Sequence, residues 1–545
     1  MAGASTNRTR RSAAAGPAPA GSTAAPVLVV GAGPTGLAAA LLLARQEIRV
    51  LVLERYDDAF PLPRAVHLDD EVHRILQDVG VAEQFAAVSR PALGLRLLDG
   101  GHRVLAEFAR GAGAGRNGYP QANMFDQPGL EVLLRKEIER HPEVELRTGV
   151  EVLAVQPDAD PPVVRWRDLA TGREQEQEAS AVLGCDGANS VTRAAIGAGL
   201  EGLRFEEQWL VVDMRCAAAL PLWDGVHQVC DPRRAATCMR VGEDRYRWEF
   251  QLRPKDSVAE LSAPAALHAL LRPWLGDVPP ESLQLVRAAA YTFRARLADR
   301  WRLGRVFLLG DAAHQTPPFV GQGLGAGLRD AANLSWKLAR VLQGRADERL
   351  LDSYQLERKA HARSQIRLAV VLGWAMTGGQ GRAAVTRRLA LSTACRLPGF
   401  AGRVLDTGSP ALAAGPLVAR SRLRRHQLVG TLVPQPWVLV EGRRQRLDDV
   451  LGAGFAVLTT ARVDPDLLLL AHRLQARVLV LGAVAQDEGA LHRWLAWGRA
   501  STVVVRPDRT VVGVARSRDR PGAALTAGSP AWLAHVSHAA TVVPA

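Results

Sequence analysis

A glycine-rich turn near the start of the chain has the residue types that bind a phosphate group. Gly31, Gly33 and Gly36 follow the pattern G-x-G-x-x-G, directly after the apolar segment Val27–Val30 and before the helical segment Leu37–Arg45. Glycines permit the tight turn and let backbone N–H groups approach a pyrophosphate at the N-terminus of the helix. The turn therefore predicts a phosphate site at the end of a buried strand.

A carboxylate follows at the position where a nucleotide ribose would bind. The apolar segment Val50–Leu53 ends at Glu54, about 20 residues after the last glycine of the turn. Glu54 can accept hydrogen bonds from an adenosine ribose, and Arg55 beside it can pack near the adenine. Turn and acid together predict a dinucleotide site, the alternative being a glycine-rich turn without a ligand. The turn alone does not distinguish NAD from FAD.

Two later motifs also follow apolar segments. The first runs from Gly310 to His314 after Val306–Leu309 and continues into Pro317–Leu324. A carboxylate at a strand end, Asp311, can hold polyol hydroxyls, and the N-terminus of the helix that follows can stabilise the negative charge of a reduced flavin ring. The second motif, Cys185–Arg193, follows Ala181–Leu183 and contains Asp186. These two motifs favour FAD over NAD.

In this order the three motifs resemble the fingerprints of the class A flavoprotein monooxygenases: GxGxxG, DGxxSxxR and GDAAH. The resemblance covers roughly residues 27–345 and is closest to the 3-(3-hydroxyphenyl)propionate and phenol hydroxylase branch. That closer likeness rests on Pro63–Ala65, Tyr119–Gln121, Trp248–Phe250 and Asp311–Trp336. The tail, with Val505–Asp508, resembles the thioredoxin-like C-terminal domain of this branch. It lacks a CxxC pair, which makes packing or dimerisation a better role for it than redox chemistry.

The resemblance implies a set of cofactor-binding residues. The first motif and the residues after it would hold the pyrophosphate and the adenosine. Asp186 would act in FAD binding and in passage of the nicotinamide, and the GDAAH segment would hold the ribityl chain and border the flavin ring. The full set is Gly31, Gly33, Pro34, Thr35, Gly36, Glu54, Arg55, Arg64, Gln127, Asp186, Asp311, Pro318, Gly321, Gly323 and Leu324. No metal site is expected.

The implied activity is hydroxylation of a phenolic ring. NADH or NADPH would reduce bound FAD, and O2 would react through a flavin C4a-hydroperoxide in a water-poor pocket. The substrate is expected to resemble 3-(3-hydroxyphenyl)propionate, in aromatic catabolism, or alternatively to be a polyketide or other bulky aromatic natural product. More remote alternatives are an FAD-linked reductase, which would need no O2, and a non-enzymatic FAD-binding partner protein.

No catalytic base can be assigned from the sequence. The polar residues of the expected substrate region include Asp213, His227, Asp231, Tyr246 and Glu249, and any of them could deprotonate a phenol. An exposed or paired polar residue is the more common role for each.

Three further residues have a structural alternative. His314 is expected to be a hydrogen-bonded structural residue rather than an acid or base. Trp248 and Phe250 are expected in a sheet, one face of which could line a substrate pocket.

The elements that must position these residues predict an α/β protein. A Rossmann-like FAD-binding domain of the para-hydroxybenzoate hydroxylase type is expected at 26–204 and 296–345, with a β-sheet substrate domain at 205–295 between them. A helical segment at 346–425 and the thioredoxin-like domain at 426–545 follow. Residues 1–25, rich in Ala, Gly, Ser and Arg, are expected to be a disordered extension.

Composition supports an ordinary globular enzyme. The net charge of +13 comes mostly from scattered arginines without a nucleic-acid motif, so no nucleic-acid partner is expected. Glycines and prolines interrupt the uncharged N-terminal stretch, so no membrane segment is expected. The five cysteines form no CxxC pair and suit a cytoplasmic protein. A homodimer remains open.

Overall fold

The computed structural model describes residues 25–61, 64–377, 410–419, 428–482, 485–516, 518, 520–527 and 531–536. The predicted N-terminal extension, except Ala25, lies outside these residues. So do Pro63 of the predicted Pro63–Ala65 motif and residues 378–409 and 420–427 of the predicted helical segment. Among the described residues, no helix is long and apolar enough to cross a membrane.

A mostly parallel six-stranded sheet forms the centre of the molecule. Its order is β18 (Arg302–Leu303), β19 (Val306–Leu308), β12 (Ala181–Gly184), β1 (Val27–Val30), β2 (Val50–Leu53) and β8 (Val144–Arg147). All pairs except β18–β19 are parallel. The strands β1, β2 and β12 are buried along their full length, as expected for a parallel sheet covered on both faces.

An almost wholly buried helix packs against this sheet, and two further helices pack against that one. Helix α1 (Pro34–Ala44) is buried at nearly every position and packs against α8 (Gly323–Leu342) and α4 (Gln127–Ile138). Two small sheets flank this unit: β9 (Val150–Gln156), β10 (Val163–Asp168) and β11 (Glu174–Glu178), and β3 (His67–Asp69), β7 (Ala122–Met124) and β4 (Arg90–Pro91). Helix α2 (Asp70–Asp78) follows β3, and α3 (Ala82–Val88) packs against α2.

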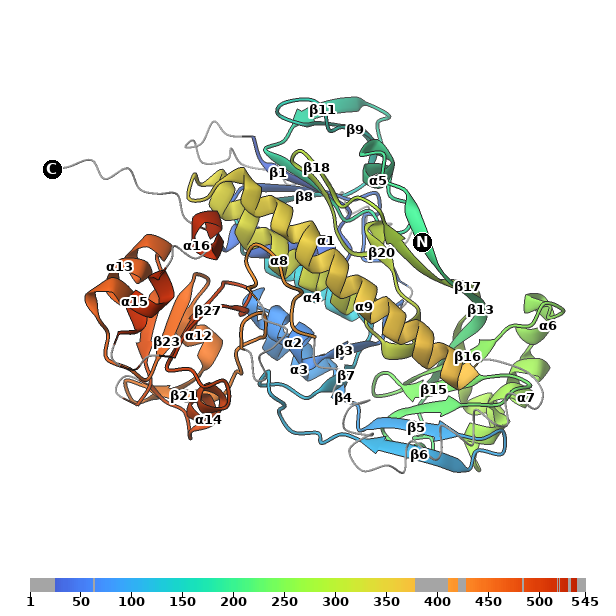
Figure 1. Ribbon diagram of the computed structural model, residues 1–545. Helices are drawn as coiled ribbons and strands as arrows, with labels where there is room; N and C mark the ends of the chain where they lie inside the picture. Colours follow the sequence, from blue (N-terminus) through green and yellow to red (C-terminus); the bar gives the residue numbers. More distant parts are fainter. Residues whose placement is uncertain are drawn as a thin grey trace, which may run out of the picture.

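A mixed eight-stranded sheet lies beside the central unit. Its order is β20 (His314–Gln315), β17 (Leu283–Ala298), β13 (Leu200–Cys216), β16 (Arg245–Gln251), β15 (Ala236–Arg240), β14 (Val226–Val229), β5 (Gly94–Leu98) and β6 (Val104–Ala109). The predicted strands Trp209–Met214, Tyr246–Leu252 and Leu283–Phe293 fall within or overlap β13, β16 and β17. Two of them are longer than expected: β13 and β17 pair from Cys216 back to Leu200 and run between the two units (Figure 1).

Helices complete both units. Helix α7 (Pro264–Leu275), preceded by α6 (Val258–Leu261), covers one face of the eight-stranded sheet. Helix α5 (Val191–Ala195) follows β12. The long helix α9 (Asp352–Thr377) crosses from the central unit towards the eight-stranded sheet (Figure 1).

The C-terminal unit has its own four-stranded sheet. The order is β24 (Arg477–Val480), β23 (Ala456–Thr459), β26 (Thr502–Val505) and β27 (Val511–Ala515). β23 and β24 are parallel and joined through α13 (Pro465–Leu474), whereas β26 and β27 form an antiparallel hairpin. Helix α14 (Ala490–Trp497) precedes the hairpin; α15 (Pro521–Thr526) and α16 (Ala531–Val536) follow it.

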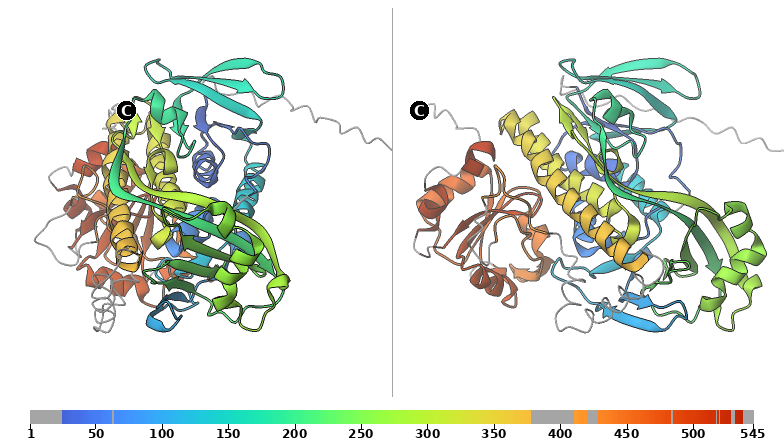
Figure 2. Two further views of the ribbon diagram at one scale, coloured as in Figure 1. Left: turned by 90° about the vertical axis from the view of Figure 1, so that its right-hand side faces the viewer. Right: turned by 45° about the vertical axis from the view of Figure 1, so that its right-hand side comes forward.

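A smaller sheet completes this unit, in the order β22 (Arg443–Arg446), β21 (Trp437–Val440) and β25 (Ala485–Gln486). Helix α12 (Leu447–Leu451) directly follows β22 in the chain. The C-terminal unit and the eight-stranded sheet lie at opposite sides of the central unit (Figures 1 and 2).

Candidate active site

The predicted motif residues meet at one edge of the central sheet. Glu54 follows β2, Gly31 follows β1, Asp186 follows β12 and Asp311 follows β19. These four strands are neighbours and parallel, so their carboxyl ends lie side by side. The carboxyl edge of such a sheet is where ligands bind in open α/β folds.

The glycine turn is built so that backbone, and not side chains, lines this edge. Gly31 has φ +97°, and a Cβ there would lie 2.6 Å from the carbonyl oxygen of Cys185. A Cβ on Gly36 would lie 2.0 Å from the carbonyl oxygen of Gly31. A Cβ on Gly33, by contrast, would meet no protein atom within 4 Å. Gly33 therefore faces open space at the N-terminus of α1.

The N-terminus of α1 offers unused backbone donors. Its N-cap, Gly33, has no side chain, and Pro34 occupies the first turn. Unsatisfied N–H groups at a helix N-terminus suit an anion such as a pyrophosphate. The side chain of Thr35 points towards α8. A Cβ built on Gly327 of that helix would lie only 2.2 Å from the hydroxyl oxygen of Thr35. Its side chain thus belongs to the contact between α1 and α8.

Glu54 ties the second strand to the glycine turn. Its Oε2 accepts a hydrogen bond from the backbone N–H of Ala32 (2.6 Å), and its Oε1 accepts one from the N–H of Tyr56 (3.0 Å). Each oxygen keeps further acceptor capacity for ribose hydroxyls. Arg55 is exposed and lies 3.8 Å from Glu151. Glu54 therefore lies directly beside the turn.

Asp186 has a role that the sequence did not reveal. Its carboxylate accepts hydrogen bonds from the hydroxyls of Ser190 (2.5 Å) and Thr192 (3.0 Å) and from the backbone N–H of Thr192 (2.9 Å). These bonds fix the start of α5. Cα of Asp186 also lies 3.3 Å from where a Cβ of Gly31 would be, which places the residue directly against the glycine turn.

Asp311 and Arg64 interact electrostatically across the site. Asp311 is open to solvent, yet the protein atoms crowded around its carboxyl raise its pKa, against the opposing charges of His314 and Arg64. Gln127 positions the Arg64 segment: its Oε1 accepts a hydrogen bond from the backbone N–H of Ala65 (2.8 Å), and its Nε2 donates to Glu131 (2.7 Å). Both polar ends of the Gln127 side chain are thus bound by protein partners.

The loop from Pro318 to Leu324 closes the edge. Gly321 has φ +61°, and a Cβ there would lie 2.6 Å from Nδ1 of His67. A Cβ on Gly323, at the start of α8, would meet nothing within 4 Å, and the N-terminus of α8 has no side-chain cap. Burial and the charge of Arg110 lower the pKa of His67 to about 4, so its imidazole is neutral at pH 7. The sequence analysis did not single out His67.

A charged network that the sequence did not predict holds this loop. Arg329 of α8 donates to Asp69 and Glu71 and to Oε1 of Gln322, the residue between Gly321 and Gly323. Nε2 of Gln322 donates in turn to Asp69 (2.9 Å). The buried opposite charges of Asp69 and Glu71 raise the pKa of Arg329 further above its ordinary value, although burial opposes this.

These features fit a bound dinucleotide. Two uncapped helix N-termini point at one sheet edge, and the two glycines Gly33 and Gly323 leave space there that no side chain fills. Carboxylates for hydroxyl groups stand at both ends, Glu54 and Asp311. His314 is not part of this set. It is fully buried, and its Nε2 lies 2.7 Å from Oδ2 of Asp330, so the structural role predicted for it is confirmed.

The eight-stranded sheet presents two different faces. One face carries Tyr246, Trp248 and Phe250 of β16, which pack with Leu267, Leu271 and Trp274 of α7. Trp248 and Phe250 lie in a sheet, as predicted, and because both side chains fill this core, only the opposite face could line a substrate pocket. The other face carries Trp209, Val211 and Asp213 of β13, paired with Gln251, Glu249 and Arg247 of β16.

That second face contacts the loops of the central unit. The ring centroid of Trp209 lies 5.9 Å from that of Phe319, in the loop before Gly321. Nη1 of Arg247 donates a hydrogen bond to the backbone oxygen of Arg64 (2.9 Å). The second face is therefore turned towards the dinucleotide site, and it is the wall on which a substrate could rest.

A buried ion cluster occupies this wall. Asp213 is fully buried between Arg247 (Nε to Oδ1, 2.8 Å) and Arg287 (Nη2 to Oδ2, 2.8 Å). Arg287 also donates to the hydroxyl of Tyr291 (2.6 Å). The sequence analysis missed Arg247, Arg287 and Tyr291. The strand sequence Arg245–Gln251 contained a signal, since three charged residues alternate there with large aromatic ones.

The structure separates the candidates for a catalytic base. Tyr246 and His227 belong to the α7 face or its extension, and the hydroxyl of Tyr246 accepts a hydrogen bond from the N–H of Leu220. Asp231 lies in a turn and pairs with Arg233. Only Asp213 and Glu249 lie on the wall, and Asp213 is bound by two guanidinium groups.

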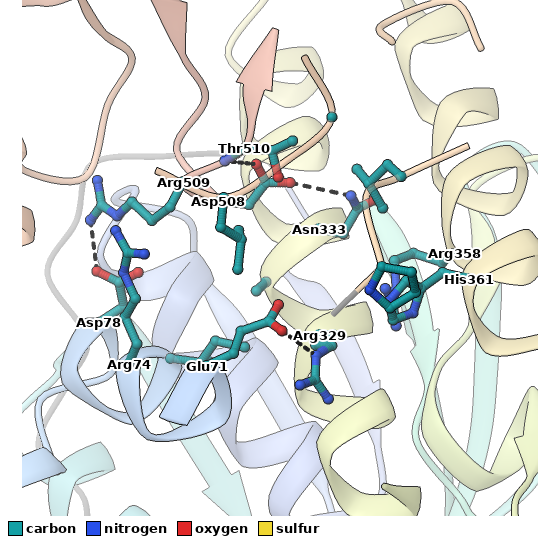
Figure 3. A pocket seen from close by; sticks show the side chains of 16 residues that line it. Glu71, Arg74, Asp78, Arg329, Asn333, Arg358, His361, Asp508, Arg509 and Thr510 are labelled. Atoms are coloured by element: carbon teal, nitrogen blue, oxygen red, sulfur yellow. Dashed lines mark hydrogen bonds and ion pairs between the residues drawn. The ribbon is translucent and has the colours of Figure 1, made fainter. Parts of the chain in front are cut away.

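A polar cavity lies elsewhere, between the central and C-terminal units (Figure 3). Its lining includes Glu71, Asp78, Arg329, Asp508 and Arg509, and ion pairs or hydrogen bonds join them within or across the units: Arg509 to Asp78, Glu71 to Arg329, and Asp508 to Asn333. The cavity is thus lined by paired charges of the unit interface, away from the glycine turn.

Comparisons with known proteins agree with this geometry. The family described as "FAD binding domain" matches residues 24–369, and "HcaD C-terminal domain" matches residues 430–527. A Burkholderia cenocepacia protein named 3-(3-hydroxy-phenyl)propionate/3-hydroxycinnamic acid hydroxylase is 33% identical, covering 95% of this chain and 98% of its own.

Two further matches extend over nearly the whole chain. A Rhodococcus jostii protein named probable NADH-specific resorcinol 4-hydroxylase is 35% identical, covering 93% of this chain and 94% of its own. The crystal structure of aklavinone-11 hydroxylase with FAD and aklavinone superposes with a TM-score of 0.77 at 25% identity, covering 94% of this chain and 99% of that one.

Proposed function

The chain belongs to the FAD binding domain family of aromatic-ring hydroxylases, and we propose that it hydroxylates a small phenol with NADH and O2. It is an FAD-dependent monooxygenase. One atom of O2 is inserted into a ring C–H bond to give a hydroxyl group, and the other atom is reduced to water. NADH supplies the two electrons. The observation that carries the proposal is the wall of polar side chains turned towards the dinucleotide site.

The residues at the sheet edge divide the work of holding FAD. Gly31, Gly33 and Gly36 would hold the pyrophosphate on backbone N–H groups, and Glu54 the adenosine ribose. Asp311 would bind the ribityl hydroxyls, with Arg64 and Gln127 alongside. Pro318, Gly321, Gly323 and Leu324 would border the ring. When bound, FAD supplies the redox chemistry that activates O2.

The surrounding protein contributes exclusion of water and a fixed electrostatic environment. Trp209 and Phe319 form an apolar contact between the wall and the loop from Pro318 to Leu324. The buried cluster of Asp213, Arg247 and Arg287 fixes charge beside it. A dry, preorganised site protects reactive intermediates and strengthens hydrogen bonds to the substrate.

The relatives support a single-ring phenol as the substrate and NADH as the reductant. The names of the Burkholderia and Rhodococcus proteins include a hydroxyphenyl acid, resorcinol and NADH. A second candidate substrate is a multi-ring natural product. The superposition on aklavinone-11 hydroxylase, with a TM-score of 0.77, covers 94% of this chain and so includes the eight-stranded sheet as well as the central unit.

One assay separates the candidates. Purified yellow holoenzyme is given NADH or NADPH with O2 and a panel containing 3-(3-hydroxyphenyl)propionate, resorcinol and a multi-ring phenol, and products are weighed by mass spectrometry. Faster NADH oxidation with a product heavier by one oxygen atom supports the proposal and names the ring. Stimulation by the multi-ring phenol alone would favour the second candidate, and O2-independent oxidation would overturn the oxygenase assignment.

We propose a thioredoxin-like fold for the C-terminal unit. The order β24-β23-β26-β27, with a parallel first pair and an antiparallel hairpin, supports this.

We also propose a cytoplasmic location and a homodimer. The four described cysteines form no disulfide among the described residues, which suits a reducing compartment. Light scattering of the purified holoenzyme would test the dimer.

A further inference from the structure

Glu249 is the acidic side chain on the wall that other groups leave most available. It lies in β16 between Trp248 and Phe250, so its side chain is on the opposite face from α7. The residue is 8% exposed. Across the sheet it is paired with Val211 on β13 and Thr237 on β15. Both neighbours are uncharged.

The carboxylate of Glu249 has no strong partner. Within the described residues it accepts no hydrogen bond, and its nearest cation is Nη1 of Arg247 at 4.0 Å from Oε1. The Glu249 side chain is 11% exposed, so its carboxylate keeps access to the space in front of the wall. Its oxygens can accept a hydrogen bond from a ligand there.

Two contacts place Glu249 between segments assigned to the flavin. On one side, Trp209 contacts Phe319 of the loop before Gly321, and Val211, the wall residue of β13 next after Trp209, is paired with Glu249. On the other side, Arg247 contacts both Glu249 and the backbone oxygen of Arg64. Glu249 therefore lies on the part of the wall that spans the two loops.

We infer that Glu249 accepts a hydrogen bond from the hydroxyl group of the phenolic substrate and takes up its proton. This inference rests on the proposed function and adds a specific residue to it. In the step, the phenolic O–H bond breaks, its electron pair remains on the ring oxygen, and a new O–H bond forms on the Glu249 carboxylate. A phenolate ring is more electron-rich than a phenol and more readily oxygenated.

The setting suits a proton acceptor. Burial raises the pKa of Glu249, although Arg247 and Arg287 oppose the shift and Asp213 adds to it. A carboxylate with a raised pKa holds a proton more strongly than an exposed one and is a better general base near neutral pH. The charged groups facing it are Arg247 on β16, Asp213 on β13 and Arg287 on β17; β15 contributes Thr237.

The test compares the wild-type holoenzyme with E249Q, which keeps the shape but cannot accept the proton. The control is E243Q, an exposed glutamate in the turn between β15 and β16 that loses the same charge. The ligands are 3-(3-hydroxyphenyl)propionate, or the phenol that the panel identifies, and its methyl ether. Binding is followed by the change in flavin absorbance and turnover by product formation across pH.

We expect E249Q to keep FAD and to bind the methyl ether within about twofold of the wild type. Its kcat for hydroxylation should fall about 10²-fold, as loss of a general base requires, and the acid limb of its pH profile should disappear. E243Q should match the wild type. Unchanged kcat and an unchanged acid limb in E249Q would overturn the inference, and so would equal loss of phenol and methyl-ether binding, which marks a structural role.

Two safeguards keep the outcomes distinct. If E249Q binds less FAD, the wild-type enzyme is tested on its own. Its binding preference for the phenol over the methyl ether should then increase with pH through the acid limb of the profile, and a preference that does not change with pH would contradict the inference. Failure of the proposed function appears earlier, as wild-type enzyme that hydroxylates no phenol of the panel. Failure of the inference appears in a wild type that is active, as E249Q behaving like it, as equal loss of both ligands in E249Q, or as a pH-independent preference for the phenol.

Discussion

At the level of single residues, the dinucleotide site depends on which glycines face protein and which face open space. Gly31 and Gly36 are held against carbonyl oxygens by their own turn, so a side chain at either would deform the fold. Gly33 and Gly323 have no protein atom within 4 Å of a Cβ. Packing against protein atoms therefore does not require glycine at these two positions, and we propose that a bound ligand does.

The variant G33A tests this distinction. Gly33 has φ −70°, which alanine adopts without strain, so the free energy of unfolding of the apoprotein should change little. The methyl group would occupy the space expected for the pyrophosphate, and the affinity for FAD should fall by about tenfold or more, that is ~1.4 kcal/mol. Flavin fluorescence titration measures this. G202A, at an exposed glycine whose Cβ also meets nothing, is the control, and equal FAD affinity in both would contradict the assignment.

The buried carboxylate of Asp213 gives a prediction about stability. In D213N the guanidinium groups of Arg247 and Arg287 lose their buried counter-charge, which typically costs about 3–5 kcal/mol. Urea unfolding of the holoenzyme measures the loss. The comparison variant is D231N. Asp231 pairs with Arg233, whose side chain is 81% exposed, so loss of this ion pair should cost at most about 1 kcal/mol. Similar costs for the two variants would mean that the cluster on the wall is well hydrated.

At the level of elements, the eight-stranded sheet serves stability on one face and substrate contact on the other. Alternation of side chains along β13 and β16 sends Val212 and Trp248 to the α7 core and Asp213 and Glu249 to the wall. Because β13 and β17 continue into the central unit, the wall is joined to the flavin edge by two continuous strands. The geometry between substrate and flavin is thereby set by the backbone.

This division predicts that the two faces can be altered separately. L271A removes a fully buried side chain of α7, and the cavity should lower the free energy of unfolding by about 2–5 kcal/mol. Turnover per bound FAD should stay near the wild-type value, since Leu271 is on the far face of the sheet. L285A, at a position 49% exposed, should change stability by about 0.5 kcal/mol or less. Loss of kcat in L271A at a temperature where it remains folded would argue against separate faces.

At the level of the whole molecule, buried charges and an apolar cluster attach the C-terminal unit to the flavin unit. Trp336 and Leu350 pack with Phe455 and Leu417 across the interface. Arg506, within the segment Val505–Asp508 that marked the tail in the sequence, is fully buried and donates to Glu357 of α9 (2.8 Å). Arg74 of α2 pairs with Asp448 (2.6 Å). This interface supports a packing role for the C-terminal unit.

The docking should depend on pH through Glu357. Burial would raise the pKa of this carboxyl, but Arg506 and Lys337 outweigh it and lower the pKa from 4.5 to about 2. A lowered carboxyl pKa contributes stability that is complete above about 4.5 and is lost as the pH falls towards about 2. The contribution at pH 7 is on the order of 3 kcal/mol.

The variant E357Q isolates this contribution. At pH 7 its free energy of unfolding should be lower than that of the wild type, and the difference should shrink as the pH falls below about 4.5. Urea unfolding at several pH values gives both curves. E201Q, which removes an exposed partner of Arg363, serves as the control. A difference that is constant with pH would mean that Glu357 acts through packing rather than charge.

The sequence alone selected the residues that lie together at the carboxyl edge of the central sheet. Each of its motifs is a run of neighbouring residues at the end of one strand, and a local run fixes its own turn, so Gly31, Glu54, Asp186 and Asp311 could be selected before any fold was known. The parallel order of β2, β1, β12 and β19 then brought them to one edge. The FAD-dependent hydroxylase assignment followed from the same residues and agrees with the comparisons.

Only the tertiary structure decided which residues of the eight-stranded sheet are turned towards the loops of the central unit. Strand β16 alternates charged and aromatic residues, but it is buried on both faces, so the alternation does not show which face is turned towards the central unit. The strand pairs and the helix α7 assign Trp248 to the core and Glu249 to the wall. The partnership of Arg506 with Glu357 joins residues far apart in the chain. Such contacts arise from long-range packing, and no local run of residues encodes them.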